Sequence, residues 1–522
     1  APLTTPTVPS KSQSLGPVAR AWAATYLAGE RQRAVGEPMQ KERVGFATEA
    51  TCFVIREAVS EHLCQQLIAN AVQRGIGVTG VDYPPSYRDN DRLVFDDPKL
   101  ATWLDGLIGS QLPQELSDDS GMWHRVGLNA RFRICRYEAG QSFRIHQDGA
   151  HTAGENIASR LTCQLYLNSA DEFSGGATRF YSARHGELLG GVRPERGTVI
   201  VFDHQLWHDG EAVPAGCKYV LRTDVLYRRE GPAPATPTTD GTRLLGHRGY
   251  VWSVISLGAG RLASASRDRS IRLWQRASKD WHCVQVLTGT ANSVSSLARV
   301  GATLWSGSRD HTLTRWDLET GQPTVLHRGD GAVLCIATHG DRVLVGSADG
   351  RLHSFTTDGT LTEIHPLSPT WLWSIAGLDP ERLVCGDEEG VLRLLSRDHP
   401  THQVELRPAC GAVHALHRLA SGRLVAGFAD GSLAVYQPDG TTLHELHHFP
   451  AHHGEVYSLS SSGTRLASGG EDNQLHVWDM SATPALHHSH RHPGFVRSVT
   501  FCDDGTVASG CYDGTVRVFP PA

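Results

Sequence analysis

The sequence lacks a run of apolar residues long enough to cross a membrane. No stretch of its 522 residues reaches the roughly 18 apolar residues that a transmembrane helix requires. The first residues, APLTTPTVPSKSQS, have neither a basic segment nor an apolar core, so we expect no secretory signal peptide. These absences predict a cytoplasmic protein with no membrane partner.

Cysteine pairs with the spacing of a zinc or redox site are also missing. The 11 cysteines are scattered and odd in number, and no C-x-x-C pair occurs. This pattern argues against a disulfide framework and against a cysteine-rich zinc site. The formal net charge of −6 lacks the basic excess typical of nucleic-acid-binding proteins, so we expect no nucleic-acid partner.

The order of the local patterns divides the chain into domains. Residues 1–40 read as a Pro/Thr/Ser-rich tail followed by a helix. Helical patterns at 60–74 and 98–112 then precede short alternating runs that continue to residue 230. A mainly β fold with this order predicts a double-stranded β-helix (jelly-roll) with flanking helices at 41–230. Residues 231–241 form a Pro/Thr-rich linker.

Beyond the linker, the sequence repeats with a period of 39 to 42 residues, which is typical of propeller blades. One acidic turn residue recurs seven times: Asp268, Asp310, Asp349, Glu389, Asp430, Asp472 and Asp513. Each lies between two short apolar runs, as expected for two strands joined by a tight turn. We predict a seven-bladed β-propeller at 242–522, in which residues 242–247 add the outer strand of the last blade.

Two histidines and one aspartate in the first domain have the spacing of a metal site. His146 and Asp148 lie in RYEAGQSFRIHQDG, and His208 follows roughly 60 residues later. Alternate residues of a strand share one face, so an H-x-D pair presents both side chains together. Two imidazoles and one carboxylate hold Fe(II) and leave coordination positions open. We predict that a second strand brings His208 beside the pair.

These residues resemble the Fe(II)/2-oxoglutarate oxygenases of the prolyl 4-hydroxylase type. The resemblance rests on RYEAGQSFRIHQDG, LTCQLYLNSADEFSGGATRFY and GTVIVFDHQLWHDGEAVPAGCKYVLRTDVLY. Residues 243–520 resemble a WD-repeat propeller through the repeat period and through six recurring positions: His247, His452, His492, Trp274, Trp316 and Trp478.

The oxygenase resemblance implies that the catalytic iron ligands are His146, Asp148 and His208. It implies 2-oxoglutarate and O₂ as cosubstrates and ascorbate as a reductant. A basic residue about ten positions after the last ligand binds the distal carboxylate of 2-oxoglutarate in this family. Lys218 stands there, and Arg222 on the same strand face is its rival.

Further residues of the binding site follow from the same resemblance. Tyr166 and Tyr137 match positions that contact the cosubstrate. The turn-rich segment before the barrel would hold the substrate through three alternating side chains: Arg88, Asn90 and Arg92. The implied reaction hydroxylates a protein or peptide side chain, prolyl first, and converts 2-oxoglutarate into succinate.

The WD-repeat resemblance implies a docking surface at the narrow end of the propeller. The residues beside the first Val or Leu of each inner strand face that end, and they are rich in aromatic rings: Tyr250, Trp252, Trp371, Trp373, Tyr457, Phe495 and Arg497. Aromatic residues and arginine are typical of peptide-binding surfaces. We expect this face to recruit the substrate or to pack against the oxygenase domain.

Two other functions stay open. The enzyme could hydroxylate a free amino acid or small metabolite, with the propeller as an assembly scaffold. The barrel could also sense iron, O₂ or 2-oxoglutarate without turnover. Succinate formation with Fe(II) separates the sensing scaffold from both enzymes. Deletion of residues 242–522 separates recruitment of the substrate from assembly.

Overall fold

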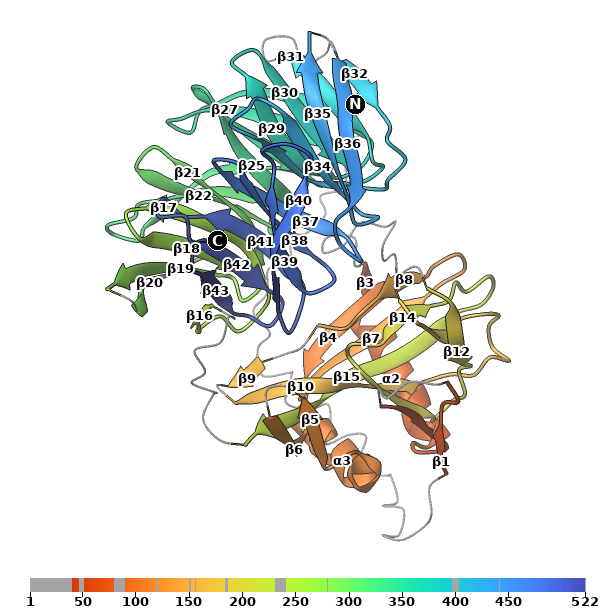
Figure 1. The fold of residues 1–522 in the computed structure, drawn as a ribbon. Coiled ribbons are helices and arrows are strands. Elements are labelled where there is room, and N and C mark those ends of the chain that lie inside the picture. The colour runs from red at the N-terminus through yellow and green to blue at the C-terminus, as the bar shows by residue number, and fades with distance from the viewer. Residues whose placement is uncertain are drawn as a thin grey trace, which may run out of the picture.

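The computed structural model describes residues 40–46, 51–78, 90–118, 121–149, 152–154, 156–183, 186–230, 241–278, 280–396, 403–440 and 442–521. They form two mainly β parts that lie against each other (Figure 1). We call residues 40–230 the N-terminal module and residues 241–521 the C-terminal module. The predicted tail and helix before residue 40 and linker residues 231–240 lie outside the described residues.

The helices of the N-terminal module begin and end at capping residues. Ser60 accepts a backbone hydrogen bond in the first turn of the first helix, and Gly75 ends that helix with a φ of 77°. Asp97 caps the second helix in the same way, and a short 3₁₀ turn replaces the predicted α-helix beyond residue 108. The helices are α2 (Glu61–Arg74), α3 (Pro98–Ile108) and η2 (Gly109–Gln111).

Two sheets face each other in the N-terminal module. The large sheet has 11 strands, eight of which follow the order β1-β2-β13-β10-β15-β7-β4-β3. Of the other three, β6 pairs with β15 and β5, and β9 pairs with β10. Its strands are β1 (Lys41–Arg43), β2 (Cys52–Ile55), β3 (Gly77–Val78), β4 (Asp91–Asp96), β5 (Glu115–Asp118), β6 (Gly121–Leu128), β7 (Arg131–Tyr137), β9 (Thr152–Gly154), β10 (Ile157–Tyr166), β13 (Val199–Asp203) and β15 (Lys218–Arg229).

The small sheet has four strands in the order β12-β11-β14-β8. They are β8 (Phe143–His146), β11 (Thr178–Tyr181), β12 (Leu188–Val192) and β14 (Trp207–Gly210). An apolar layer joins the two sheets, for example where the rings of Phe180 and Phe202 meet at 5.3 Å. The helices cover the opposite face of the large sheet through a second apolar layer. This arrangement places the interior of the module between the two sheets.

Four-stranded sheets follow one another along the C-terminal module (Figure 1). The first four are β17 (Val251–Gly258), β18 (Arg261–Ser266), β19 (Ser270–Ala277) and β20 (Asp280–Thr288); β21 (Val294–Val300), β22 (Thr303–Ser308), β23 (Thr312–Trp316) and β24 (Pro323–Arg328); β25 (Val333–His339), β26 (Arg342–Ser347), β27 (Arg351–Thr356) and β28 (Leu361–Pro366); β29 (Leu372–Asp379), β30 (Arg382–Asp387), β31 (Leu392–Ser396) and β32 (Gln403–Leu406).

The remaining sheets are β33 (Val413–Arg418), β34 (Leu424–Phe428), β35 (Ser432–Asp439) and β36 (Thr442–Pro450); β37 (Val456–Ser462), β38 (Arg465–Gly470), β39 (Gln474–Asp479) and β40 (Ala485–Arg491); and β41 (Val496–Phe501), β42 (Val507–Cys511), β43 (Val516–Phe519) and β16 (Thr242–Leu244). In the last sheet β16 pairs with β43, which confirms the predicted exchange of the outer strand. The first strands of neighbouring sheets contact one another, and β17 contacts β41, so the sheets form a ring.

Two of these sheets each contain a network of buried polar side chains. Ser264 Oγ receives the Trp274 Nε1–H at 2.8 Å and lies 2.8 Å from His247 Nε2, while His247 Nδ1 contacts Asp268. An equivalent network lies in the sheet formed by β37 to β40: His452, Ser468, Asp472 and Trp478. Buried polar atoms need such partners, so these networks stabilise the sheets in which they occur.

The described residues include no helix that is both long and apolar enough to cross a bilayer. The 11 cysteines, all within the described residues, carry free thiols.

Candidate metal and substrate site

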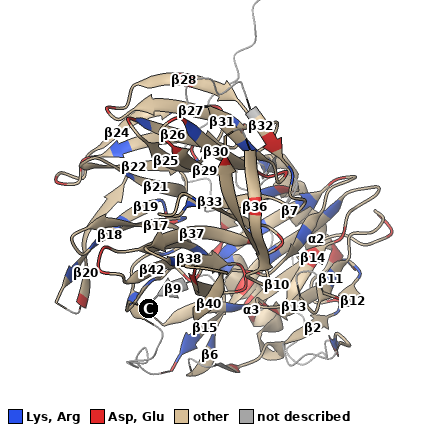
Figure 2. Ribbon diagram, turned by 45° about the horizontal axis from the view of Figure 1, so that its top comes forward, with Lys and Arg blue, Asp and Glu red and all other residues tan. Residues whose placement is uncertain are grey.

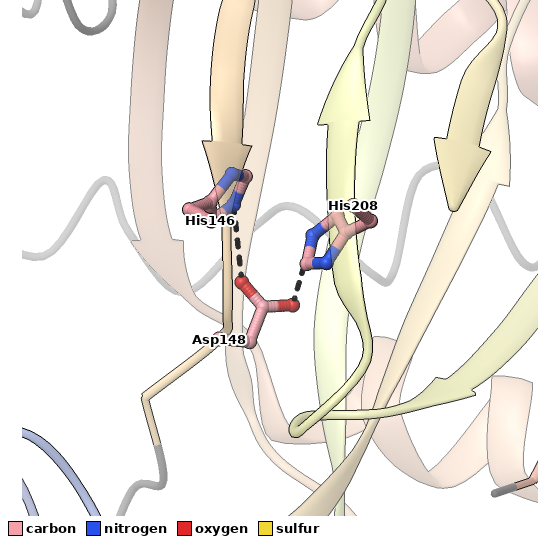
Figure 3. Close-up of side chains that lie close together, drawn as sticks. All are labelled: His146, Asp148 and His208. Atoms are coloured by element: carbon pink, nitrogen blue, oxygen red, sulfur yellow. Dashed lines mark ion pairs between the residues drawn. The ribbon is translucent and has the colours of Figure 1, made fainter. Parts of the chain in front are cut away.

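The three predicted ligands come together between the two sheets of the N-terminal module (Figure 3). His146 at the end of β8 and His208 in β14 are directly paired residues of neighbouring antiparallel strands. Asp148 follows β8, and its amide donates to the His204 carbonyl at 2.9 Å. The potential ligand atoms of the three side chains lie within 4.8 Å of one another. Strand pairing therefore brings the distant histidine to the H-x-D pair.

Hydrogen bonds to the backbone orient both imidazoles. His146 Nδ1 lies 2.8 Å from the Arg144 carbonyl oxygen, and His208 Nδ1 lies 2.8 Å from the Leu206 carbonyl oxygen. A carbonyl only accepts, so each Nδ1 carries a proton, and in the neutral form of the ring the lone pair is then on Nε2. The Nε2 atoms lie 3.5 and 3.6 Å from the two oxygens of Asp148. This donor set fits a divalent metal ion bound by two neutral imidazoles and a carboxylate.

Asp148 is a buried carboxylate with cationic and hydroxyl neighbours. Arg222 Nη1 lies 2.8 Å from Asp148 Oδ1, and the Thr162 hydroxyl donates to the other oxygen. Burial alone would raise the pKa of Asp148, but Arg222 and then the histidines hold this pKa well below its ordinary value. The aspartate is therefore ionised and ready to bind a cation.

Aromatic rings cover the histidines. Phe143 stacks on His146 with 3.6 Å between ring centroids, and Phe202 meets His208 edge-on at 4.6 Å. Burial and then the neighbouring His146 lower the pKa of His208 to about 3. The unprotonated form that binds a metal is therefore the one present at neutral pH.

Lys218 is a buried cation on the inner face of the large sheet. Its ammonium donates to the Gly176 carbonyl at 2.6 Å and lies 5.1 Å from the Tyr137 ring and 5.8 Å from the Tyr166 ring. Within the described ranges, no carboxylate lies within ion-pair distance of this ammonium. Burial lowers the pKa of Lys218 to about 8. The ammonium thus lies where an anionic ligand would relieve the cost of its burial.

One cavity of about 960 Å³ connects the metal-site residues with the C-terminal module. His146, Asp148 and Arg222 line it on one side. The other side includes all seven residues of the predicted docking face: Tyr250, Trp252, Trp371, Trp373, Tyr457, Phe495 and Arg497. Residues predicted for two separate surfaces therefore share one cavity.

Two family models match different segments of the chain. A family model described as the 2OG-Fe(II) oxygenase superfamily matches residues 132–223, and one described as WD domain, G-beta repeat matches residues 239–275, 443–479 and 485–519. The chain carries a 2OG-Fe(II) oxygenase domain and WD40 repeats. The oxygenase match spans β7 to β15 and includes His146, Asp148, His208 and Lys218.

Individual curated relatives match about two fifths to half of the chain. WD repeat-containing protein 37 of Homo sapiens is 28% identical over 228 residues, which cover 41% of this chain and 45% of the relative. Autophagy-related protein 16 of Arabidopsis thaliana is 25% identical over 303 residues, or 53% of this chain and 57% of the relative. The chain thus spans about half the length of the curated relatives it matches.

Solved WD40 structures share the fold of about half of the chain. The WD40 β-propeller domain of Doa1 is similar with a TM-score of 0.50 and 20% identity, covering 54% of this chain and 96% of that chain. The WD40 repeats of RRP9 give a TM-score of 0.50 and 18% identity, with 54% and 98% coverage. At this identity the likeness concerns the fold alone.

The predicted substrate segment is only partly described. Arg88 lies outside the described residues. Asn90 is buried, and its side-chain amide donates to the Asp91 carbonyl at 3.0 Å. Arg92 in β4 pairs in register with Cys135 and lines the cavity that His146 and Asp148 also line. Of the three predicted residues, Arg92 is therefore the one that lines the cavity, and its contact with a substrate stays a prediction.

The sequence patterns did not single out several residues that lie around the candidate site. Thr162, Arg133 and Asp224 lie on the inner face of the large sheet, and Arg133 pairs with Asp224 at 3.3 Å. The alternation of RLTCQLYLN and KYVLRTDVLY holds the signal, because every second residue from Thr162 and from Lys218 faces inward. The stacking of Phe143 on His146 has no comparable signal in the sequence.

Proposed function

We propose that the protein is an Fe(II)- and 2-oxoglutarate-dependent dioxygenase that hydroxylates a side chain of a protein or peptide. The observation that carries this proposal is the convergence of His146, Asp148 and His208, with both Nδ1 protons bonded to backbone carbonyls. The oxygenase family match over the same residues supports it. A prolyl side chain is the first substrate to test, by resemblance alone.

His146, Asp148 and His208 would hold the iron. When bound with 2-oxoglutarate, Fe(II) activates O₂, and the two oxygen atoms go to succinate, formed with release of CO₂, and to a hydroxyl on the substrate carbon. The chain's own residues prepare this chemistry. Arg222 keeps Asp148 ionised and fixed, while Phe143 and Phe202 hold the imidazole rings and exclude water from them.

Lys218 would bind the distal carboxylate of 2-oxoglutarate. Its burial without a carboxylate partner among the described residues favours this role, and Arg222 is already committed to Asp148 and Asp224. Tyr166 donates its hydroxyl to Thr178 at 2.7 Å, and Tyr137 is paired in register with Lys218. These two tyrosines would form the walls of the cosubstrate site, and ascorbate would serve as the reductant.

The fold supports separate roles for two domains, one in catalysis and one in docking the substrate. We assign the facing sheets at 41–230 to a jelly-roll oxygenase and the ring of four-stranded sheets at 242–522 to a seven-bladed propeller, joined by a linker at 231–241. The propeller would dock the substrate, because its aromatic residues line the cavity that reaches the metal site. The docking role distinguishes this proposal from a hydroxylase of small metabolites whose propeller only assembles complexes.

Succinate formation tests the enzymatic part of the proposal. Purified protein with Fe(II) and labelled 2-oxoglutarate should release succinate, and His146→Ala should abolish the release. His124→Ala is the matched control, because His124 is an exposed histidine on β6. Succinate formation that persists in His146→Ala would contradict the triad, and its absence in the wild type would favour a sensing scaffold. Peptides that gain about 16 Da only with Fe(II) identify the substrate.

A further inference from the structure

The C-terminal module supplies a wall of the cavity from all of its sheets. Tyr250, Arg309, Ala348, Trp373, His414, Tyr457 and Phe495 come from successive sheets around the ring, and all line the cavity. They lie at the start of each first strand or in the turn between the second and third strands. One end of the ring of sheets therefore covers the cavity, and the central axis of the ring passes through the cavity wall.

Arg497 occupies this axis. The second residues of the first strands are equivalent around the ring: Trp252, Ser295, Leu334, Trp373, His414, Tyr457 and Arg497. The Arg497 guanidinium carbon lies 4.1 Å from the Tyr457 ring centre, 5.4 Å from that of Trp252 and 5.5 Å from that of Trp373. Three aromatic faces from other sheets thus hold the guanidinium by cation–π contact.

The three rings around Arg497, which we call the aromatic cage, leave its N–H groups available to a ligand. Among the residues that the structure describes, no carboxylate lies within ion-pair distance of Arg497. Aromatic faces contact the plane of a guanidinium, whereas its five N–H groups point outward in that plane. The planar fork matches a carboxylate through two parallel hydrogen bonds. The three rings hold the guanidinium in this position before a ligand arrives.

The cavity is more basic than the chain as a whole. Figure 2 shows basic and acidic residues interspersed over both modules, and the net charge of the chain is −6. The cavity, in contrast, is lined by seven arginines and five carboxylates: Arg92, Arg133, Arg144, Arg222, Arg267, Arg309 and Arg497, with Asp148, Glu388, Glu389, Asp430 and Glu455. Local charge therefore favours an anionic ligand.

The size of the cavity favours a chain segment over a free amino acid. Proline has eight non-hydrogen atoms, which would fill roughly 240 Å³ at about 30 Å³ for each atom, the share of a water molecule in the liquid. The cavity of about 960 Å³ would remain mostly empty around such a ligand. A peptide of several residues would fill it and contact both modules.

We infer that the cavity binds a polypeptide segment with an Asp or Glu side chain, and that Arg497 receives this carboxylate while a neighbouring residue of the segment reaches the metal site. The C-terminal module then selects the sequence around the modified residue, in addition to recruiting the substrate. Arg497 is a specificity residue in this scheme. The inference rests on the proposed function for the fate of the segment, whereas the binding preference itself needs no turnover.

Peptide selection on the full-length protein tests the inference. Immobilised protein is offered a library of short peptides with blocked termini and random residues around a central proline, and retained peptides are sequenced by mass spectrometry. Wild type should enrich Asp and Glu at one position, and Arg497→Gln should lose this enrichment with binding about tenfold or more weaker. Arg497→Glu should favour Lys or Arg instead. Arg491→Gln is the matched control, because Arg491 is exposed on the outer strand β40.

Two further measurements keep the outcome decisive. Arg497→Lys keeps a cation in the cage in case the neutral variant does not fold, and it should retain the acidic preference with weaker binding. Succinate release without peptide is measured for every variant, so that a loss of peptide binding is told apart from a loss of the metal site. Equal acidic enrichment in Arg497→Gln, or no acidic enrichment in wild type, would overturn the inference. Acidic enrichment without any succinate release would contradict only the proposed function.

Discussion

Gly149, the residue after the Asp148 carboxylate, lies against the Tyr250 ring of the C-terminal module. A Cβ at Gly149 would collide with the Tyr250 hydroxyl and come within 2.7 Å of its Cζ. The Tyr250 ring is itself fixed, because it stacks on Tyr512 at 4.2 Å with only 3° between their planes. The loop after Asp148 and the ring of sheets therefore meet without room for one methyl group.

Gly149→Ala should disturb this contact. The added methyl must push the modules apart or turn Tyr250, so we predict about a tenfold loss in peptide hydroxylation efficiency with little change in uncoupled succinate release. Tyr250→Ala in the same chain should restore part of the loss by removing the clashing ring. Gly106→Ala serves as the control, since a Cβ there meets nothing within 4 Å. A loss that Tyr250→Ala leaves untouched would locate the defect at Asp148 instead.

Substitution of Lys218 should separate cosubstrate binding from metal binding. Lys218→Met removes the buried ammonium, so we predict that the KM for 2-oxoglutarate rises by about 30-fold or more, as expected when one partner of a buried ion pair is lost. The Kd for a divalent metal should stay within a few-fold of wild type in calorimetry. Lys218→Arg keeps the positive charge but changes the shape of the side chain. The larger guanidinium must fit beside Gly176, where space is tight: a Cβ added to Gly176 would lie 3.1 Å from Lys218 Cδ.

Arg222→Gln should give the opposite pattern. Arg222 contacts the carboxylate of Asp148, a proposed metal ligand, at 2.8 Å, and removing such a supporting partner typically weakens metal affinity by about 10- to 100-fold. The KM for 2-oxoglutarate, measured at saturating metal, should change less than in Lys218→Met. If Arg222→Gln raised this KM as strongly as Lys218→Met does and left metal affinity intact, Arg222 would be the cosubstrate anchor.

Stability against pH should report the burial of Lys218. Burial lowers its pKa in the folded protein to about 8, below the unfolded value near 10.4, so the unfolded state binds the extra proton between these values. Ligand-free Lys218→Met should therefore be more stable than wild type by about 3 kcal/mol below pH 8. The difference should shrink as pH rises and vanish above about pH 10.4. Urea unfolding of both proteins across this range measures it, and a pH-independent difference would contradict a buried ammonium.

The sequence allows prediction of features set by local spacing but not those set by packing. Ser60 and Gly75 bound their helix as expected, because capping depends on neighbouring backbone groups. The H-x-D pair and His208 meet because strand pairing follows alternation. Lys218 and Arg222 share a strand face, so only the neighbours supplied by other strands distinguish them. The contact of Gly149 with Tyr250 depends on how two modules pack, which no local pattern records.

Removal of Ser468 should destabilise the C-terminal module more than removal of Ser306. Ser468 Oγ is fully buried, receives the Trp478 Nε1–H at 2.9 Å and lies 2.8 Å from His452 Nε2. Ser306 Oγ receives the Trp316 Nε1–H at 2.8 Å and has no histidine partner among the described residues. Ser468→Ala strands two buried groups at about 1–3 kcal/mol each, and Ser306→Ala strands one. The urea midpoint of the module, followed by tryptophan fluorescence, should fall about twice as far for Ser468→Ala. Equal shifts would mean that the histidine contributes nothing to the network.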